Sequence, residues 1–238
     1  MKKRFIAPDS ADKRIPFAVS ELEKMGYTKV EKADNADFVL LGVNQKPEYD
    51  CKIPVFAGNV KGENVFDYTK DEEFVIKNAA LTAEGAISLA ISESDITLIN
   101  SRVLITGLGR IGKALLRYTE PFTKDITVCA RSDSDRASAE NTGAALTKFE
   151  LLKYNGDYDF IFNTVPHPVF NEAELKAVNK DAVLIELASF PGGIDRHFAK
   201  HYCLKLIDGK ALPSRYSKKS AGILVAKAVD KMAREVLV

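Results

Sequence analysis

The sequence has no tryptophan and few cysteines. Cys51, Cys129 and Cys203 are the three cysteines among its 238 residues, and no two of them form a Cys-x-x-Cys pair. An odd and scattered set of cysteines argues against a disulfide framework. We therefore expect a reducing environment and predict a cytoplasmic location.

The chain also has no excess of charge of one sign. Its 34 Lys and Arg stand against 33 Asp and Glu, a formal net charge of +1, so no overall field draws it to nucleic acid or to a membrane surface. The apolar stretch behind the basic start MKKRF ends at Pro8, which predicts no signal peptide. We see no apolar run that approaches the ~20 residues needed to cross a bilayer. We therefore predict neither nucleic acid nor a membrane as a partner.

The composition that remains is that of a globular protein. Hydrophobic residues make up 46% and charged residues 28% of the chain, and at ~150 residues per domain the length predicts two modest domains. The first, residues 1–81, is expected to be a small α/β domain, because short apolar runs alternate with polar turns. The expected strands cover residues 4–7, 38–43, 54–57 and 74–76, and a helix covers residues 14–25.

The second domain, residues 82–218, has the clearer pattern. It begins with a helix that Thr82 caps, predicted from apolar residues at helical spacing: Ala83, Ala86, Ile87, Ala90 and Ile91. Strands and helices then alternate, which is typical of a parallel sheet covered on both faces. The strands are expected at 102–106, 126–130, 158–163, 182–187 and 204–207, and the helices at 109–119, 134–142, 171–178 and 194–201. A last helix, 219–238, is predicted to pack back onto the first domain beside the helix at 82–92.

A glycine turn follows the first strand of this second domain. It reads Gly107-Leu108-Gly109-Arg110-Ile111-Gly112 and opens a helix. In a strand-turn-helix setting this spacing predicts a dinucleotide site, because the glycines allow a tight turn, a close approach of the backbone to a pyrophosphate, and close packing of the helix on the sheet. The alternative is a glycine turn without a ligand. We therefore predict an α/β fold with a Rossmann-type doubly wound parallel sheet plus the smaller N-terminal α/β domain.

The residues after the second strand of this domain indicate which nucleotide is bound. NAD proteins place Asp or Glu there for the ribose hydroxyls, whereas this chain has Arg131 and Ser132. A guanidinium can bind the additional phosphate of NADP and stack on adenine. We therefore predict NADP(H) as the cofactor. The alternative is that Arg131 is a solvated loop residue and Asp133 binds the ribose.

Several motifs from about residue 76 to the C-terminus resemble those of the dipicolinate synthase A-subunit family. They are Thr82-Ala83-Glu84-Gly85 with Ala90-Ile91, the glycine turn, Ala130-Arg131-Ser132, Asn163-Thr164-Val165-Pro166, Leu187-Ala188-Ser189-Phe190-Pro191-Gly192-Gly193-Ile194-Asp195, and Lys219-Ser220-Ala221-Gly222. The resemblance implies an NADP-dependent Rossmann-type reductase of a sporulation-associated branch of the lysine and diaminopimelate pathway. It further implies oxidation of a dihydrodipicolinate-type substrate to the aromatic dicarboxylate, and a flavoprotein-like second subunit. The N-terminal part is shorter than expected for the family, and Phe190 stands where a basic residue is expected.

The ligand of an open α/β sheet lies beyond the carboxyl ends of its strands. Asn163, Thr164, Val165, Pro166, Ala188 and Ser189 are therefore predicted to surround the nicotinamide. Hydride and proton removal from a dihydropyridine requires mainly that two carboxylates be oriented and water excluded. We predict that Arg215, Lys218 and Ser220 bind the substrate, with Ser220 capping the last helix. Lys219, Thr82 and Glu84 are the candidate catalytic residues, and Glu84 is the candidate proton acceptor.

Alternative functions remain open on the sequence. Arg215 and Lys218 could instead be solvated charges of a surface loop that bind no substrate. Glu84 could instead serve only to stabilise the N-terminus of its helix. The alternatives to the oxidase are a shikimate-dehydrogenase-like reductase of another small carboxylate and a catalytically silent NADP-binding subunit. The 2-hydroxyacid dehydrogenase alternative is disfavoured, because Phe190 cannot supply the arginine which that reaction needs. No metal site is predicted, since His197 and His201 lack a third ligand. We expect a small dicarboxylate as the substrate. We also expect the chain to form a homo-oligomer.

Overall fold

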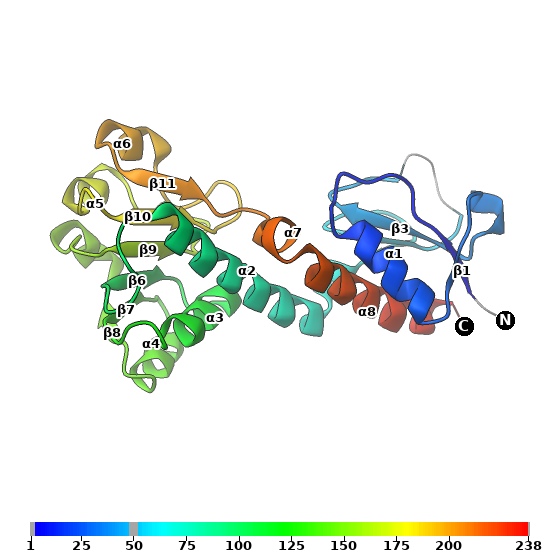
Figure 1. The fold of residues 1–238 in the computed structure, drawn as a ribbon, viewed down its shortest axis with the longest axis horizontal. Helices are drawn as coiled ribbons and strands as arrows, with labels where there is room; N and C mark the ends of the chain where they lie inside the picture. Colours follow the sequence, from blue (N-terminus) through cyan, green and yellow to red (C-terminus); the bar gives the residue numbers. More distant parts are fainter. Residues whose placement is uncertain (1–2, 48–51, 238) are drawn as a thin grey trace. The chain divides into compact units, whose positions relative to one another are not determined.

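The computed structural model describes residues 3–47 and 52–237 (Figure 1). It divides into two compact units, residues 1–81 with 213–238, and residues 82–212. The sequence placed residues 213–218 in the second domain, whereas the structure places them in the first unit. Cys51 lies outside the described residues.

The first unit contains a parallel sheet of short strands. These are β1 (Arg4–Ile6), β2 (Thr28–Lys29), β3 (Phe38–Val43), β4 (Val55–Gly58) and β5 (Val65–Asp67), in the order β2-β1-β3-β4-β5. The sequence predicted the inner strands and missed β2 and β5. Both missed strands lie at the edges of the sheet and lack fully buried residues, so they carry no apolar run that sequence analysis could detect.

Helices cover this sheet and close its core. They are α1 (Ile15–Lys24), the 3₁₀ helices η1 (Ala33–Asn35) and η2 (Tyr68–Lys70), α7 (Leu212–Tyr216) and α8 (Lys218–Val236), with the beginning of α2 (Glu72–Glu93). Val225 and Val229 of α8 share one buried cluster with Phe5 and Phe38 of the strands. Gly222 brings α8 close to α1, because a Cβ atom there would lie 2.5 Å from the carbonyl oxygen of Arg14. The last helix is therefore part of the core of the first unit.

Helix α2 corrects two sequence predictions. Residues 74–76, predicted as a strand, belong to α2, and Thr82 lies inside this helix rather than at its N-cap. The Asp71 side chain accepts a hydrogen bond from the backbone N–H of Phe74 at 2.9 Å, and Glu72 and Glu73 lie in the first turn. An acidic cap of this kind starts a helix, and it outweighs the strand propensity of Phe74, Val75 and Ile76.

Helix α2 is also more apolar than the sequence analysis recognised. An 18-residue window of it has a mean hydropathy of 1.4, so by length and composition alone it could cross a membrane. Half of that window is buried inside the fold, and its buried residues, such as Ala86 and Ala90, belong to a hydrophobic core. A core helix passes the same test of length and composition, so the finding is weak support for a membrane span.

A buried ion pair lies in the loop after β1. Arg14 is 9% exposed, and its guanidinium donates hydrogen bonds of 2.8 and 2.7 Å to the two carboxylate oxygens of Asp12. Asp12 also accepts a bond of 3.1 Å from the N–H of Val43 at the end of β3. Burial raises the pKa of Asp12, but Arg14 and the backbone donors outweigh burial and hold this pKa below its usual value.

Asp12→Asn should lower the free energy of unfolding at pH 7 by on the order of 3 kcal/mol, because Arg14 stays buried without its counter-charge. Urea unfolding measures this, with Asp9→Asn, at an exposed position of the same loop, as the control. Because the folded pKa is lowered, the contribution of Asp12 is complete above the unfolded value of ~3.9 and disappears as the pH falls through the folded value. The stabilities of wild type and variant should therefore converge in acid. Equal stability at pH 7 would contradict the assignment.

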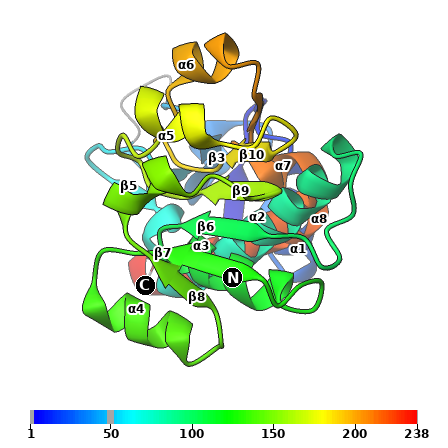
Figure 2. The same ribbon diagram turned by 90° about the vertical axis from the view of Figure 1, so that its left-hand side faces the viewer.

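The second unit is built on a fully parallel sheet. Its strands are β6 (Val103–Thr106), β7 (Ile126–Cys129), β8 (Ala145–Thr147), β9 (Phe160–Asn163), β10 (Val183–Glu186) and β11 (Lys205–Asp208), in the order β11-β10-β9-β6-β7-β8. Figure 2 shows β10, β9, β6, β7 and β8 following one another across the sheet. The predicted doubly wound sheet is confirmed, and β8 is the strand that the sequence analysis missed.

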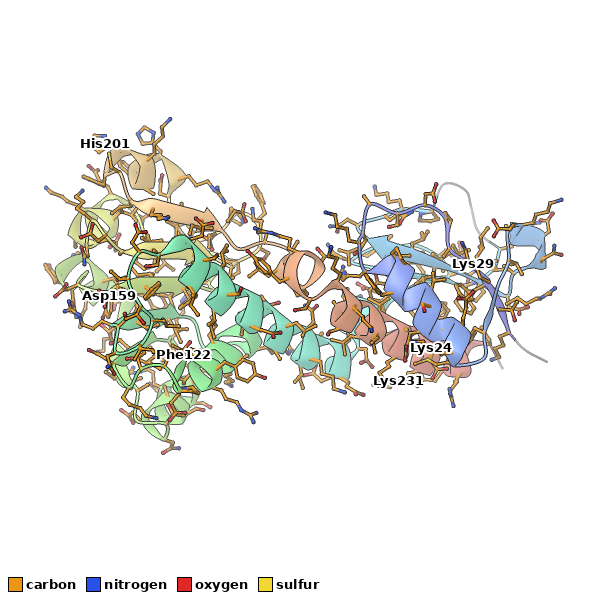
Figure 3. All side chains as sticks on the ribbon, viewed as in Figure 1. Lys24, Lys29, Phe122, Asp159, His201 and Lys231 are labelled. Atoms are coloured by element: carbon orange, nitrogen blue, oxygen red, sulfur yellow. The ribbon has the colours of Figure 1, made fainter. Side chains whose placement is uncertain are left out.

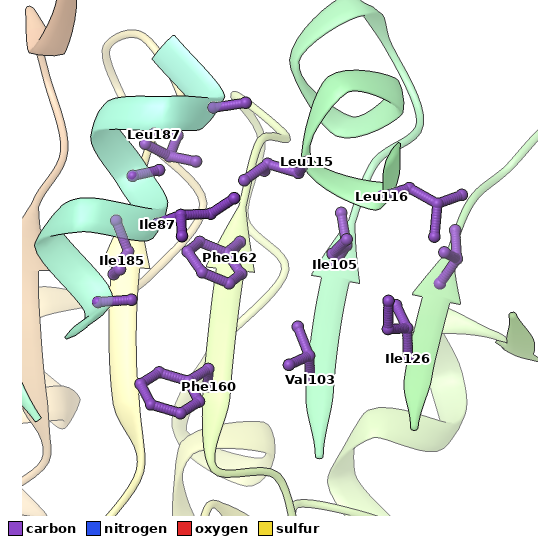
Figure 4. Packing of buried hydrophobic residues seen from close by; sticks show 14 of the residues in the cluster. Ile87, Val103, Ile105, Leu115, Leu116, Ile126, Phe160, Phe162, Ile185 and Leu187 are labelled. Carbon is purple, nitrogen blue, oxygen red and sulfur yellow. The ribbon is translucent and has the colours of Figure 1, made fainter. Parts of the chain in front are cut away.

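Helices lie on both faces of this sheet. One face carries α2 and α3 (Arg110–Thr119), whose Ile87, Leu115 and Leu116 pack with Ile105 and Phe162 of the strands (Figure 4). The other face carries η3 (Phe149–Tyr154), α5 (Glu172–Ala177) and α6 (Arg196–His201), and α4 (Asp133–Glu140) connects β7 to β8. The strand order reverses between β6 and β9, which is where a ligand crevice is expected outside the carboxyl ends.

Candidate functional site

The glycine turn lies between β6 and α3, at the reversal of the strand order. Gly107 has φ +85°, a conformation that glycine adopts readily, and its N–H donates to the carbonyl of Cys129 at 2.8 Å. A Cβ atom on Gly107 would lie 2.5 Å from the hydroxyl oxygen of Thr164. A Cβ atom on Gly112 would lie 2.1 Å from the carbonyl oxygen of Gly107. The first and third glycines are therefore required by the fold itself.

Gly109 differs from these two glycines. It is exposed, it has φ −71°, and no heavy atom of the described residues beyond Gly109 and its two chain neighbours lies within 4 Å of the position its Cβ atom would take. The backbone conformation therefore does not require glycine, and no described neighbour excludes a side chain. Gly109 is also the N-cap residue of α3 and, as a glycine, has no side chain that could cap the first turn. Open space at a helix N-terminus, where N–H groups point outward, fits a pyrophosphate.

The end of β7 is followed by the residues that were predicted to contact the adenosine half of a nucleotide. Arg131 is exposed, and its guanidinium carbon lies 5.8 Å from the ring centre of Phe149. Ser132 is the N-cap of α4, and its hydroxyl accepts the N–H of Asp135 at 3.0 Å. The Asp133 side chain is 98% exposed and forms a 3.4 Å ion pair with Arg136. Arg131, predicted to bind the additional phosphate, and Asp133, the alternative ribose ligand, therefore both lie at the surface.

A buried polar network joins the carboxyl ends of β6, β9 and β10. Thr106 donates to the Asn163 side-chain oxygen at 2.6 Å, and the Asn163 amide donates to Glu186 at 2.7 Å. Thr106 and Asn163 are fully buried and Glu186 is 2% exposed. The sequence analysis missed Glu186. The signal was available, because Asn163 and Glu186 are polar residues that end otherwise apolar strands.

Glu186 also holds the loop that follows β10. Its carboxylate accepts the backbone N–H groups of Ala188, Gly193 and Ile194 at 3.0, 2.8 and 2.9 Å. Gly193 has no room for a side chain, because a Cβ atom there would lie 2.5 Å from the amide nitrogen of Asn163. The glycine pair in the Pro191-Gly192-Gly193 stretch is therefore explained by close packing onto this network.

These contacts revise the prediction for Asn163. Its side chain is fully buried and bonds inward to Thr106, Glu186 and the Val165 carbonyl, so it supports the loops rather than offering its amide to a carboxamide. Thr164 is half-buried and donates to the Thr106 carbonyl at 2.8 Å. The remaining predicted residues divide by exposure: Leu108 and Ala188 are buried, Ile111 and Val165 are half-buried, and Arg110, Pro166 and Ser189 are exposed.

The predicted substrate residues lie in α7 and α8 of the first unit. Arg215 belongs to α7, with its guanidinium 5.5 Å from the ring centre of Tyr216. Helix α8 begins at Lys218 with Ser217 as the N-cap residue, so Lys218, Lys219 and Ser220 lie in its first turn. Ser220 is therefore not the cap. Lys218, which precedes the predicted helix 219–238, lies in the exposed first turn of α8.

Thr82 and Glu84 lie inside α2 and belong to the second unit. Thr82 is buried and Glu84 is exposed. Glu84 does not lie in the first turn of its helix, because α2 begins at Glu72, ten residues before the predicted start. Stabilisation of a helix N-terminus therefore does not explain Glu84. The candidate catalytic residues therefore come from both units, since Glu84 belongs to the second unit and Lys219 to the first.

No alternative chemistry is indicated elsewhere in the described part of the second unit. Burial, with Glu150 nearby, raises the pKa of the Cys129 thiol to about 12, so this cysteine is not poised as a nucleophile. His201 lies on the outer end of α6 (Figure 3) and is exposed. Within residues 3–47 and 52–237, no group of three or more His, Cys, Asp or Glu could hold a metal ion.

Comparisons with known proteins show what the chain is similar to. Residues 77–189 match the family model "D-isomer specific 2-hydroxyacid dehydrogenase, NAD binding domain". The chain is 32% identical over 168 residues to the A-subunit of dipicolinate synthase of Bacillus subtilis, a match that covers 69% of this chain and 56% of that protein. The chain thus matches little more than half the length of that relative.

Solved structures extend the likeness to both units. The crystal structure of the dipicolinate synthase A-subunit from Bacillus subtilis has a TM-score of 0.85 at 22% identity, and covers 100% of this chain and 97% of that one. The corresponding structure from Bacillus halodurans has a TM-score of 0.84 at 21% identity, with 97% of each chain covered. At these identities the structures establish the fold.

The doubly wound sheet, the glycine turn and the matched family model define a class: a Rossmann-type protein whose second unit is similar to the NAD binding domain of the D-isomer specific 2-hydroxyacid dehydrogenases. Within that class, the chain is a homologue of the A-subunit of dipicolinate synthase.

Proposed function

We propose that the second unit binds NADP(H). The observation that carries this proposal is the open space at Gly109, where neither backbone conformation nor a described neighbouring atom calls for glycine. A pyrophosphate at the N-terminus of α3 supplies the reason. Arg131 favours NADP over NAD, because it is exposed just after β7, at the place where an NAD protein would carry a carboxylate.

The test of nucleotide choice is Arg131→Ala. A charge-assisted hydrogen bond contributes ~1.5–3 kcal/mol, so the Kd for NADPH should rise roughly 10- to 100-fold, while the Kd for NADH should change little. Fluorescence or calorimetric titration measures both. Arg117→Ala removes an exposed arginine from the last turn of α3 and is the matched control. Equal losses for NADPH and NADH would remove the NADP assignment, and a loss confined to NADH in Asp133→Asn would favour the alternative.

We further propose oxidoreductase activity on a dihydrodipicolinate-type dicarboxylate. The homologue is part of a dipicolinate synthase, and oxidation to the aromatic ring requires loss of one hydride and one proton. NADP⁺, when bound, would accept the hydride. The residues of this chain would orient the substrate, exclude water and take up the proton, for which exposed Glu84 is the proposed acceptor and Thr82 a neighbouring support on α2.

The substrate carboxylates are proposed to bind at the N-terminus of α8. Lys218 and Lys219 occupy its first turn, and the side chain of the N-cap residue Ser217 forms no capping hydrogen bond. Cations are unfavourable at this end of a helix, because the macrodipole is positive there. A bound anion would relieve that repulsion and accept the N–H groups. Ser220 in the same turn and Arg215 in α7 complete the proposed carboxylate site.

One observation favours the catalytically silent alternative. Phe190, at the position where the family resemblance implies a basic residue, is 88% exposed. An exposed phenylalanine supplies no carboxylate contact. We therefore keep two alternative functions: a catalytically silent NADP-binding subunit, and a reductase of another small carboxylate.

Binding and turnover measured on the same purified chain separate these proposals. The enzyme proposal predicts NADPH binding together with NADP⁺-dependent oxidation of dihydrodipicolinate, alone or with the candidate second subunit. NADPH binding without turnover in either mixture would favour the silent protein or another substrate. Absence of binding to both NADPH and NADH would overturn every function proposed here.

A further inference from the structure

Glu186 is a buried carboxylate that is held by uncharged donors. It is 2% exposed, and each oxygen accepts two hydrogen bonds: Oε1 from Asn163 and the Ala188 N–H, and Oε2 from the Gly193 and Ile194 N–H groups. The group acts only as an acceptor in these four bonds, as an ionised carboxylate does. A carboxylate held in this way is costly to bury, and retaining it calls for a reason beyond packing.

The position of Glu186 supplies that reason. It is the last residue of β10, next to Asn163 at the end of β9 in the parallel register. In a doubly wound sheet a dinucleotide lies across the reversal point. With the adenosine half over β7, the nicotinamide half belongs over β9 and β10. The loop that Glu186 anchors, residues 187–194, follows the same strand end.

A fixed negative charge distinguishes the two redox forms of a nicotinamide. The oxidised ring carries a positive charge and the reduced ring is neutral, so an anion under the nicotinamide half stabilises only the oxidised form. Low dielectric inside the unit strengthens this effect, since charges in a buried site are weakly screened.

We propose that Glu186 favours binding of the oxidised nicotinamide nucleotide and so biases the site toward substrate oxidation. Glu186 acts as a positioning residue for the 187–194 loop and as a source of negative potential, and it does not touch the reacting atoms. This inference rests on the proposed nucleotide binding.

The test is the ratio of Kd for NADP⁺ to Kd for NADPH, measured by calorimetry on the full chain. Glu186→Gln keeps the shape and removes the charge, so the ratio should rise roughly ten-fold, the order expected for one unit charge inside a protein at an effective dielectric constant of ~20. Glu186→Asp keeps the charge and disturbs the hydrogen bonds, so its ratio should stay near the wild-type value. Asp159→Asn is the matched control. Its carboxylate accepts the Arg102 N–H at 2.7 Å, and it directly precedes β9, at the opposite end of the strands from Glu186.

The outcomes separate this inference from the proposed function. If wild type binds neither nucleotide, the proposed function fails. If wild type binds both and Glu186→Gln weakens both equally, the charge inference is overturned while nucleotide binding stands. Should Glu186→Gln not fold, the wild-type ratio decides: a ratio below one supports the inference, and tighter binding of NADPH than of NADP⁺ contradicts it. Hydrogen exchange at Gly193 and Ile194 should accelerate in Glu186→Gln and stay slow in Asp159→Asn.

Discussion

Gly109→Ala is expected to abolish measurable nucleotide binding while leaving the protein folded. The new methyl group meets no described protein atom within 4 Å, and φ −71° is accessible to alanine, so the melting temperature should change little. The methyl group would occupy the space beside the N-terminus of α3 where the pyrophosphate is proposed to lie. A loss of at least ~100-fold in affinity, or about 2.7 kcal/mol, is expected for NADPH.

Titration calorimetry and thermal unfolding of the same preparation check this result. Gly143→Ala is the matched control, because Gly143 also has no described atom within 4 Å of its Cβ position but has φ +81°. Alanine there should lower stability by ~1–2 kcal/mol from backbone strain and leave affinity unchanged. Unchanged NADPH affinity in Gly109→Ala would show that the turn does not hold a pyrophosphate.

Gly112→Ala should have the opposite effect and destabilise the protein severely. Its Cβ atom would lie 2.1 Å from the carbonyl oxygen of Gly107. Neither atom can move away unless the backbone itself shifts. Overpacking of this kind costs ~1–3 kcal/mol or more, although alanine in place of glycine inside a free helix would be stabilising by ~1 kcal/mol. A loss of stability in Gly112→Ala, rather than a gain, would therefore show that α3 packs closely against the turn.

Urea unfolding measures the loss in Gly112→Ala, and Lys113→Ala, at the next and exposed position of α3, is the control that should remain as stable as wild type. A Gly112→Ala protein as stable as wild type would mean that the turn opens easily. The two glycine variants together separate a residue kept for the ligand from a residue kept for the fold.

Much of the second unit could be predicted from the sequence. Its strands are continuous apolar runs such as Val103–Thr106 and Phe160–Asn163, and they are buried along their length. Such runs can be recognised in a sequence because both faces of a parallel sheet are covered, so successive residues of each strand are apolar. The glycine turn could be predicted for the same local reason, since its spacing is imposed by one strand, one turn and one helix.

The first unit was harder to predict because its edges and helix ends depend on contacts distant in sequence. Strands β2 and β5 are two and three residues long and lack buried runs. The start of α2 depends on Asp71, whose carboxylate also binds Lys231 of α8 at 2.6 Å. A contact across 160 residues leaves no local pattern, so Phe74, Val75 and Ile76 were predicted as a strand.

The sequence by itself determined the class of sheet in the second unit, the glycine turn between β6 and α3 and the kinship with the dipicolinate synthase A-subunit, because each depends on residues close together in the chain. Only the tertiary structure decided that Asn163 faces inward, that Glu186 is a buried anchor for the loop after β10, and that the glycines at 107 and 112 serve the fold while the one at 109 leaves open space. Hydrogen bonds and close approaches between strand ends arise when the sheet brings distant segments together, and no spacing along the chain records them.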